Sequence, residues 1–234
     1  MATLVVVQRP DWTDTACHWG QYWMKEHVVK PAEEAGFDLV DLYGDDAVRS
    51  KVLEACKREN FIYFSGLGHG NATIFTGQRR GKVFWKGDEE TKAISNGHHF
   101  NFLSCVFGRE GARWMQEEGK AVGVHGYDES FIFVIERGNF PDKYATPFFD
   151  SHTTVDRELF KGATHGEAHQ ACLDRFDYWL DNAPQACRRY LAWDREHKVF
   201  WGDPQARLLP SKPPSIWEII LRWIRKLLRL LGFR

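Results

Sequence analysis

The chain has 234 residues, a formal net charge of −1 and 43% hydrophobic residues. This length suits one large domain or a domain with an appendage, and the hydrophobic fraction is enough to build a sizeable core. The near-neutral charge provides no global basic field of the kind that attracts nucleic acid, so no nucleic-acid partner is expected.

The five cysteines stand at positions 17, 56, 105, 172 and 187, and no two of them have a CxxC spacing. An odd count without that spacing argues against a disulfide framework or a zinc module and fits a reducing compartment. The first apolar run, Leu4–Gln8, is too short for the hydrophobic region of a signal peptide and has no basic segment before it. We therefore expect a cytoplasmic protein.

Strand and helix patterns alternate along most of the chain. Leu4–Gln8 is a continuous apolar run, as expected of a strand that is buried on both faces. Further strands are predicted at Phe37–Leu42, Phe61–Ser65, Phe100–Ser104 and Ala121–His125, with a hairpin at Thr73–Trp85. Helices are predicted between them, at Thr13–Ala35, Asp45–Arg58, Asp88–Ser95 and Arg109–Glu118. This alternation predicts a three-layer α/β fold with a mostly parallel central sheet flanked by helices.

The second half of the chain is more helical. Helices are predicted at Pro147–Phe160 and Thr164–Asn182, and Arg188–Asp194 with Lys198–Trp201 suggest a closing hairpin. We expect one domain over residues 1–209, a Pro-rich linker over 210–214 and a basic amphipathic helix over 215–234.

A reactive side chain follows each of two predicted strands. Phe61–Ser65 leads to His69, and Phe100–Ser104 leads directly to Cys105. Parallel neighbouring strands would bring both side chains to the carboxyl edge of the sheet, where open α/β sheets carry their chemistry. A thiol and an imidazole placed there are the parts of a cysteine nucleophile and its base. Each residue also has a structural interpretation, as a small buried Cys or a surface His.

The sequences around these two residues resemble a known family. SGLGHGN, FLSC and the late VFWGDPQARL are similar to segments of caspase-like (clan CD) cysteine peptidases, and most of all to the gingipain-type C25 family. The likeness covers roughly residues 61–209. It implies a caspase-like fold in which His69 is the acid/base and Cys105 the nucleophile of peptide hydrolysis. It also implies an oxyanion hole made by the N–H groups of Gly70 and Cys105.

Caspase-like enzymes select the residue before the scissile bond with a charged pocket. The segment after the fifth strand contains Asp128 and Glu129, which could receive a basic side chain and are otherwise solvated loop charges. Tyr127 and Trp85 could wall a groove, and either could equally belong to the core. We expect a preference for cleavage after a basic residue.

Other clusters of His and Asp residues are candidate metal sites. His98 and His99 are adjacent on a strand and point to opposite faces, so one metal would not bind both easily. His165 and His169 are four residues apart on a helix, but the HGEAH sequence is not HExxH, which favours a structural helix face. Calcium could bind a group of carboxylates near the second strand, Asp38, Asp41, Asp45 and Asp46, although no EF-hand spacing is present. No cofactor and no metal are expected.

The last 24 residues, 211–234, have a net charge of +5, which leaves −6 for the rest of the chain. Ile216, Ile219, Ile220, Trp223 and Ile224 belong to one apolar stripe of a helix whose opposite side is basic. These features are typical of an interfacial helix that lies in the headgroup plane of a membrane. The alternative is docking on a partner or on its own domain. The residues expected to make the contact are Trp217, Arg222, Trp223, Arg225, Lys226 and Arg229.

The function predicted from the sequence is a cysteine endopeptidase that acts on protein or peptide substrates through a Cys–His dyad. Its C-terminal helix would hold it peripherally on an anionic membrane or against a partner protein. The alternatives are a catalytically inactive caspase-like binding or scaffold module and a membrane-active effector.

Overall fold

The centre of the protein is a six-stranded sheet with the strand order β2-β1-β3-β6-β7-β8. The computed structural model describes residues 3–136 and 140–208. The parallel strands are β1 (Leu4–Arg9), β2 (Asp38–Tyr43), β3 (Phe61–Leu67), β6 (His99–Leu103) and β7 (Gly123–Tyr127). The edge strand β8 (Lys198–Gly202) runs antiparallel to β7. The predicted mostly parallel α/β sheet is therefore confirmed.

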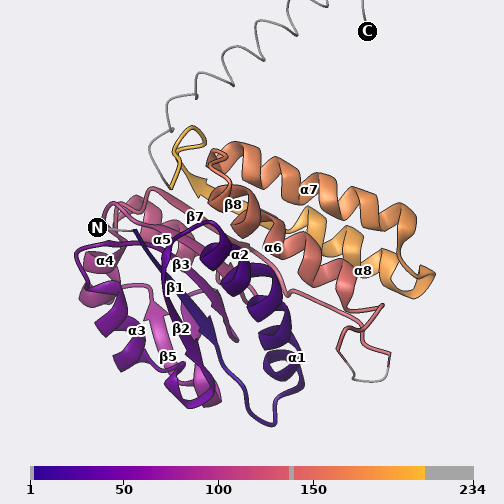
Figure 1. The fold of residues 1–234 in the computed structure, drawn as a ribbon, viewed down its shortest axis with the longest axis horizontal. Helices are drawn as coiled ribbons and strands as arrows, with labels where there is room; N and C mark the ends of the chain where they lie inside the picture. Colours follow the sequence, from indigo (N-terminus) through magenta and orange to yellow (C-terminus); the bar gives the residue numbers. More distant parts are fainter. Residues whose placement is uncertain (1–2, 137–139, 209–234) are drawn as a thin grey trace, which may run out of the picture.

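Helices cover both faces of this sheet (Figure 1). One face carries a helical segment made of α1 (Thr15–Met24), a π-helical turn (Lys25–Val29) and α2 (Lys30–Glu34). The same face carries α6 (Thr146–Phe160), α7 (His165–Asn182) and α8 (Gln185–Glu196). The other face carries α3 (Arg49–Cys56), α4 (Glu89–Ser95), α5 (Gly111–Glu117) and the hairpin of β4 (Ile74–Thr76) and β5 (Lys82–Trp85). Short 3-10 turns occupy Gly44–Asp46 and Gln78–Arg80.

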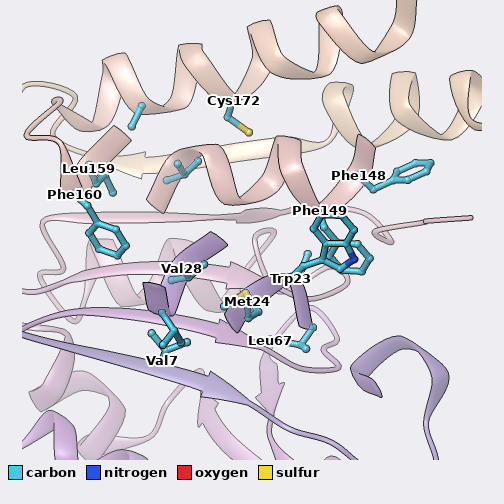
Figure 2. Packing of buried hydrophobic residues seen from close by; sticks show 14 of the residues in the cluster. Val7, Trp23, Met24, Val28, Leu67, Phe148, Phe149, Leu159, Phe160 and Cys172 are labelled. Atoms are coloured by element: carbon cyan, nitrogen blue, oxygen red, sulfur yellow. The ribbon is translucent and has the colours of Figure 1, made fainter. Parts of the chain in front are cut away.

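The alternation of side chains along β1 explains the three layers. Every residue of this strand is buried. Val5 and Val7 join the cluster under α1 and α6, whereas Leu4 and Val6 join the cluster on the opposite face. Figure 2 shows the first cluster, in which Trp23 stacks on Phe149 with ring planes 3° apart. A strand buried on both faces must be apolar throughout, which the run LVVV supplies.

The predicted closing hairpin is wrong. Arg188–Asp194 belongs to the helix α8, and the strand β8 pairs with β7 instead. The buried residues of α8 are Cys187, Leu191 and Asp194, four and three positions apart, which is the spacing of a helix face. β7 also begins two residues later than the predicted Ala121, because residues 121–122 lead into the sheet.

The C-terminal linker and helix, including Trp217, Arg222, Trp223, Arg225, Lys226 and Arg229, lie outside the described residues. Within residues 3–136 and 140–208, none of the helices has the length and apolar character needed to cross a membrane.

Candidate active site

The strand ends that precede His69 and Cys105 are neighbours. β3 pairs with β6 in parallel, and the Gly68 N–H donates a hydrogen bond to the Leu103 carbonyl at 3.1 Å. The following residues stay in contact: a Cβ atom at Gly70 would lie 2.6 Å from the Cys105 carbonyl oxygen. Only glycine allows this approach of the two backbones, so the sequence His69-Gly70 is suited to a loop that lies against Cys105.

Cys105 is partly exposed at the tip of the loop after β6. Its Sγ lies 3.9 Å from the carbonyl oxygen of Phe131, and burial raises the pKa of the thiol. The next residue, Val106, has a φ of 61°, a left-handed conformation that is rare for a β-branched side chain. Such strain costs of the order of 1–3 kcal/mol and concentrates at functional sites. The turn directly after Cys105 thus holds Val106 in a conformation that its β-branched side chain does not favour.

His69 has a carboxylate partner that the sequence analysis did not find. Its Nε2 lies 2.9 Å from Oδ2 of Asp14, and the two side chains are 29% and 15% exposed. Nε2 is buried, and its short contact with Asp14 Oδ2 does not have the alignment of a hydrogen bond. The Trp12 ring packs edge-on against the imidazole, with centroids 6.0 Å apart. Poorly aligned catalytic contacts are common before substrate binds.

Asp14 is fixed by its place in the fold as the N-cap of α1. Its Oδ1 accepts hydrogen bonds from Ala16 N–H at 3.1 Å and Cys17 N–H at 3.2 Å. Burial would raise the pKa of Asp14, but the Cys17 N–H and the contact with His69 outweigh burial, and the pKa is lowered. A sequence reader could identify Asp14 as a cap from the helix that follows it, but not as the partner of His69, 55 residues away.

A second thiol approaches His69. The ligand atoms of Cys17, Asp14 and His69 lie within 4.8 Å of one another. Cys17 is only 1% exposed, and burial strongly raises the pKa of its thiol. A peptide bond has little access to this sulfur, whereas Cys105 reaches the surface. Cys105 is therefore the more accessible thiol of the two.

The backbone beside Cys105 leaves one donor of the predicted oxyanion hole unused. Gly70 forms an antiparallel bridge with Phe75, closed by bonds on either side of it. Thr76 N–H donates to the His69 carbonyl at 2.9 Å, and Asn71 N–H donates to the Ile74 carbonyl at 3.0 Å. The Gly70 N–H takes no part in these two bonds, which leaves it able to face a substrate oxygen.

The predicted specificity segment lies directly beside the Cys105 loop, since Val106 N–H donates to the Glu129 carbonyl at 2.9 Å. The Asp128 carboxylate lies 2.9 Å from His197 Nδ1, and the Glu129 carboxylate is ion-paired with Arg109. Tyr127 is completely buried, in contact with Phe131 and His152. Its position corresponds to the core alternative rather than to a groove wall.

Trp85 lies on the second hairpin strand and is partly buried. The guanidinium of Arg49 lies 4.1 Å from the centre of its ring. This cation–π contact connects β5 to α3 and gives Trp85 a structural role on that face of the sheet.

Three of the four candidate metal-ligand histidines, His99, His165 and His169, belong to a stack that also contains His125. His99 Nδ1 lies 2.6 Å from His165 Nε2, and His165 Nδ1 lies 2.9 Å from His125 Nε2. His98 faces the other way and lies 2.8 Å from the Ile94 carbonyl oxygen, as expected of adjacent strand residues. Burial lowers the pKa of His165 to about 3 and that of His99 and His169 to about 4. These imidazoles are neutral at pH 7 and support the structural interpretation.

Three of the four carboxylates near the second strand have other partners. Asp41 is paired with Arg9 at 2.6 Å, Asp45 lies 3.7 Å from Arg79, and Asp38 accepts a hydrogen bond from Asn60. Among the residues that the structure describes, the set with metal-ligand geometry is Asp14, Cys17 and His69.

Two surface hollows flank the loop that carries Asp14. One, of about 670 Å³, lies between Trp12, Tyr43 and Asp45, and the other, of about 550 Å³, lies against His18 and Trp19. Both include Asp11, Trp12 and Thr13, which follow the carboxyl end of β1, and the larger one also includes Tyr43 at the end of β2.

Comparison with known proteins supports the fold. No family model matches the chain, and no curated protein matches it. Among solved structures, it is similar to the complex of Porphyromonas gingivalis RgpB pro- and mature domains, with a TM-score of 0.55 and 9% identity over 92% of this chain and 52% of that one. It is also similar to the Arg-specific cysteine proteinase gingipain R (RgpB), with a TM-score of 0.55 and 11% identity over 92% of this chain and 51% of that one.

This likeness confirms the predicted caspase-like α/β fold. The chain spans about half the length of the two solved chains that it matches. The sequence identity is low, so what the site does must be argued from its own residues.

Proposed function

We propose that the protein is a cysteine endopeptidase with Cys105 as nucleophile and His69 as acid/base. The observation that carries this proposal is the adjacency of the two strand ends, with Gly70 against the Cys105 carbonyl. The partly exposed Cys105 and the imidazole held by Asp14 then belong to the same edge of the sheet. The fold shared with two cysteine proteinase structures adds support.

The raised pKa of Cys105 means that the resting nucleophile is a thiol rather than a thiolate. Because Nε2 of His69 faces Asp14, its Nδ1 is the nitrogen that accepts the Cys105 proton when substrate binds. The sulfur then leaves its contact with the Phe131 carbonyl and attacks the scissile carbon. The N–H groups of Gly70 and Cys105 stabilise the oxyanion. His69 returns the proton to the leaving amine, and water hydrolyses the acyl-enzyme to regenerate the thiol.

Asp14 acts as a positioning residue in this mechanism. Its carboxylate holds the Nε2 side of the imidazole and favours the imidazolium that forms after proton transfer. Its own orientation is set by the two N-cap hydrogen bonds, so the start of α1 supports the acid/base.

We propose cleavage after Arg or Lys. Asp128 and Glu129 follow β7 beside the Cys105 loop, and a basic side chain of the substrate would replace His197 or Arg109 as their partner. The solved relative gingipain R is described as Arg-specific, which agrees with this preference. Asp128→Asn and Glu129→Gln should each lower kcat/KM for basic peptides relative to neutral ones. An unchanged ratio in both variants would contradict the assignment.

Labelling with a peptidyl acyloxymethyl ketone tests the dyad. We expect one modified cysteine per chain, lost in Cys105→Ala, slowed in His69→Ala and retained in Cys172→Ala, which removes a completely buried thiol of α7. Labelling that survives Cys105→Ala would contradict the proposal. Absence of labelling in the folded wild-type protein would favour the inactive scaffold module instead.

The C-terminal segment 215–234 supplies a second part of the proposal, membrane attachment. Its basic charge and apolar stripe support binding to anionic lipid. Full-length protein should sediment with vesicles that contain phosphatidylserine, and protein truncated at residue 209 should not. Equal recovery of the two forms in the pellet would contradict this part.

A further inference from the structure

We propose that Asp14, Cys17 and His69 form a binding site for a single Zn²⁺ ion, which inhibits the peptidase by occupying its acid/base. The inhibitory part rests on the proposed function, whereas the metal site itself does not. Nε2, Sγ and a carboxylate oxygen lie within 4.8 Å of one another. They come from separate elements, since Asp14 and Cys17 begin α1 and His69 follows β3.

The three ligand types are those that zinc prefers. Zinc binds thiolate at about 2.3 Å and imidazole nitrogen or carboxylate oxygen at about 2.0–2.2 Å, so tetrahedral ligands are roughly 3.3–3.8 Å apart. The ligand atoms, which lie within 4.8 Å of one another, reach this spacing by a movement of about 1 Å, within the range of side-chain rotation. Three protein ligands leave the fourth position for water, which matches an inhibitory or exchangeable ion better than a closed structural one.

The arrangement of the atoms favours a metal over a purely hydrogen-bonded triad. Nε2 of His69 is buried and has no aligned hydrogen-bond partner within residues 3–136 and 140–208. Asp14 uses Oδ1 to cap α1, which leaves Oδ2 directed at His69. Cys17 is 1% exposed and forms the floor of the site, whereas the His69 side chain is 29% exposed and provides the route for entry.

Charge also fits a divalent cation. Cys17 would release its proton to solvent on binding, so thiolate, carboxylate and neutral imidazole together balance the two positive charges of zinc. An opposing charge close to the site is that of Arg80, whose Nη2 lies 3.4 Å from Asp14 Oδ2. Its side chain is 67% exposed and can turn into solvent. Removal of this charge should tighten metal binding.

Coordination would stop the proposed reaction without touching the nucleophile. A zinc ion on Nε2 prevents formation of the imidazolium and takes Asp14 away from its positioning role. Cys105 does not belong to this cluster of ligand atoms, which consists of Asp14, Cys17 and His69. Inhibition would therefore depend on Cys17, a residue outside the proposed catalytic machinery.

Cobalt titration of the full-length Cys105→Ala protein tests the site, since thiolate ligation to Co²⁺ produces a charge-transfer band in the near ultraviolet. We expect one equivalent of Co²⁺ to produce the band and Zn²⁺ to displace it. The band should be lost in Cys17→Ser/Cys105→Ala and retained in the matched Cys56→Ser/Cys105→Ala, which removes a different buried thiol. Arg80→Gln/Cys105→Ala should bind Zn²⁺ more tightly in competition with a chromophoric chelator.

A band that persists without Cys17, or no band at one equivalent in folded protein, would overturn the metal site. The readout does not use catalysis, so failure of the proposed peptidase activity would leave this result unaffected. On active protein, zinc inhibition should be lost in Cys17→Ser and retained in Cys56→Ser. Equal inhibition of both variants would overturn the inhibitory role alone.

Discussion

Replacement of Asp14 separates its two roles, the cap of α1 and the partner of His69. Asn caps helices about as well as Asp, so Asp14→Asn should leave the cap hydrogen bonds from Ala16 and Cys17 in place and remove only the charge. Asp14→Ala removes both. Comparison of the two variants therefore assigns any loss of activity to the ion pair or to the helix start.

The geometry sets the size of the effect. Two unit charges about 2.9 Å apart interact by roughly 6 kcal/mol at an effective dielectric constant near 20. The side chains are 29% and 15% exposed and the contact is poorly aligned, which reduces the contribution. A carboxylate at this range typically stabilises a charged imidazole by about 1–3 kcal/mol. We expect kcat/KM to fall about 5- to 150-fold in Asp14→Asn.

Activity on a fluorogenic peptide and urea unfolding measure the two roles. Asp14→Asn should unfold within a few tenths of a kcal/mol of wild type, and Asp14→Ala should lose about 1 kcal/mol of unfolding free energy. Wild-type kcat/KM in Asp14→Asn would refute the positioning role. Equal stability of Asn and Ala variants would refute the cap.

Three other outcomes follow from the site and its surroundings. Gly70→Ala places a methyl group 2.6 Å from the Cys105 carbonyl oxygen and should cost about 1–3 kcal/mol of unfolding free energy together with most of the activity. The tolerated control is Gly81→Ala, whose Cβ meets only the Gln78 carbonyl oxygen at 3.3 Å, and equal unfolding free energies of the two variants would count against the close approach. Alkylation of Cys105 by iodoacetamide should still accelerate above pH 9, because burial raises the pKa of that thiol, and a rate that is flat from pH 6 would contradict the resting thiol. The unfolding free energy should fall as the pH drops from 6.5 to 4, because the pKa of His99 is lowered to about 4 and that of His165 to about 3, so the unfolded chain binds these protons first; the partly buried His27 and His169 add to this slope, and chemical denaturation at several pH values that shows no slope in this window would contradict neutral, buried rings.

The architecture could be predicted because its signals are local. The run Leu4–Gln8 and the alternation of strands with helices predict a parallel sheet. The reactive side chains that follow β3 and β6, His69 and Cys105, suggest that these two strands are neighbours, which their pairing confirms. Gly36, with a φ of 82°, ends the first helical segment where the sequence predicts its end.

The features that escaped prediction depend on contacts between distant residues. Arg188–Asp194 covers only two helical turns, so its sequence predicts a strand. The helical face of α8 becomes visible only when Cys187 is included. The pairing of Asp14 with His69 and the approach of Cys17 arise from the packing of α1 against the end of β3. Tyr127 belongs to the core because the Phe131 ring packs against it, a contact that the sequence does not predict.

The most direct measurement of the central claim is a cleavage profile on a peptide library, run with wild type, Cys105→Ala and Cys17→Ala. Wild type and Cys17→Ala should cut after Arg or Lys, and Cys105→Ala should cut nothing. Cleavage that survives the loss of the Cys105 thiol, or folded wild-type protein that leaves the whole library intact, would contradict the assignment of that sulfur as the nucleophile.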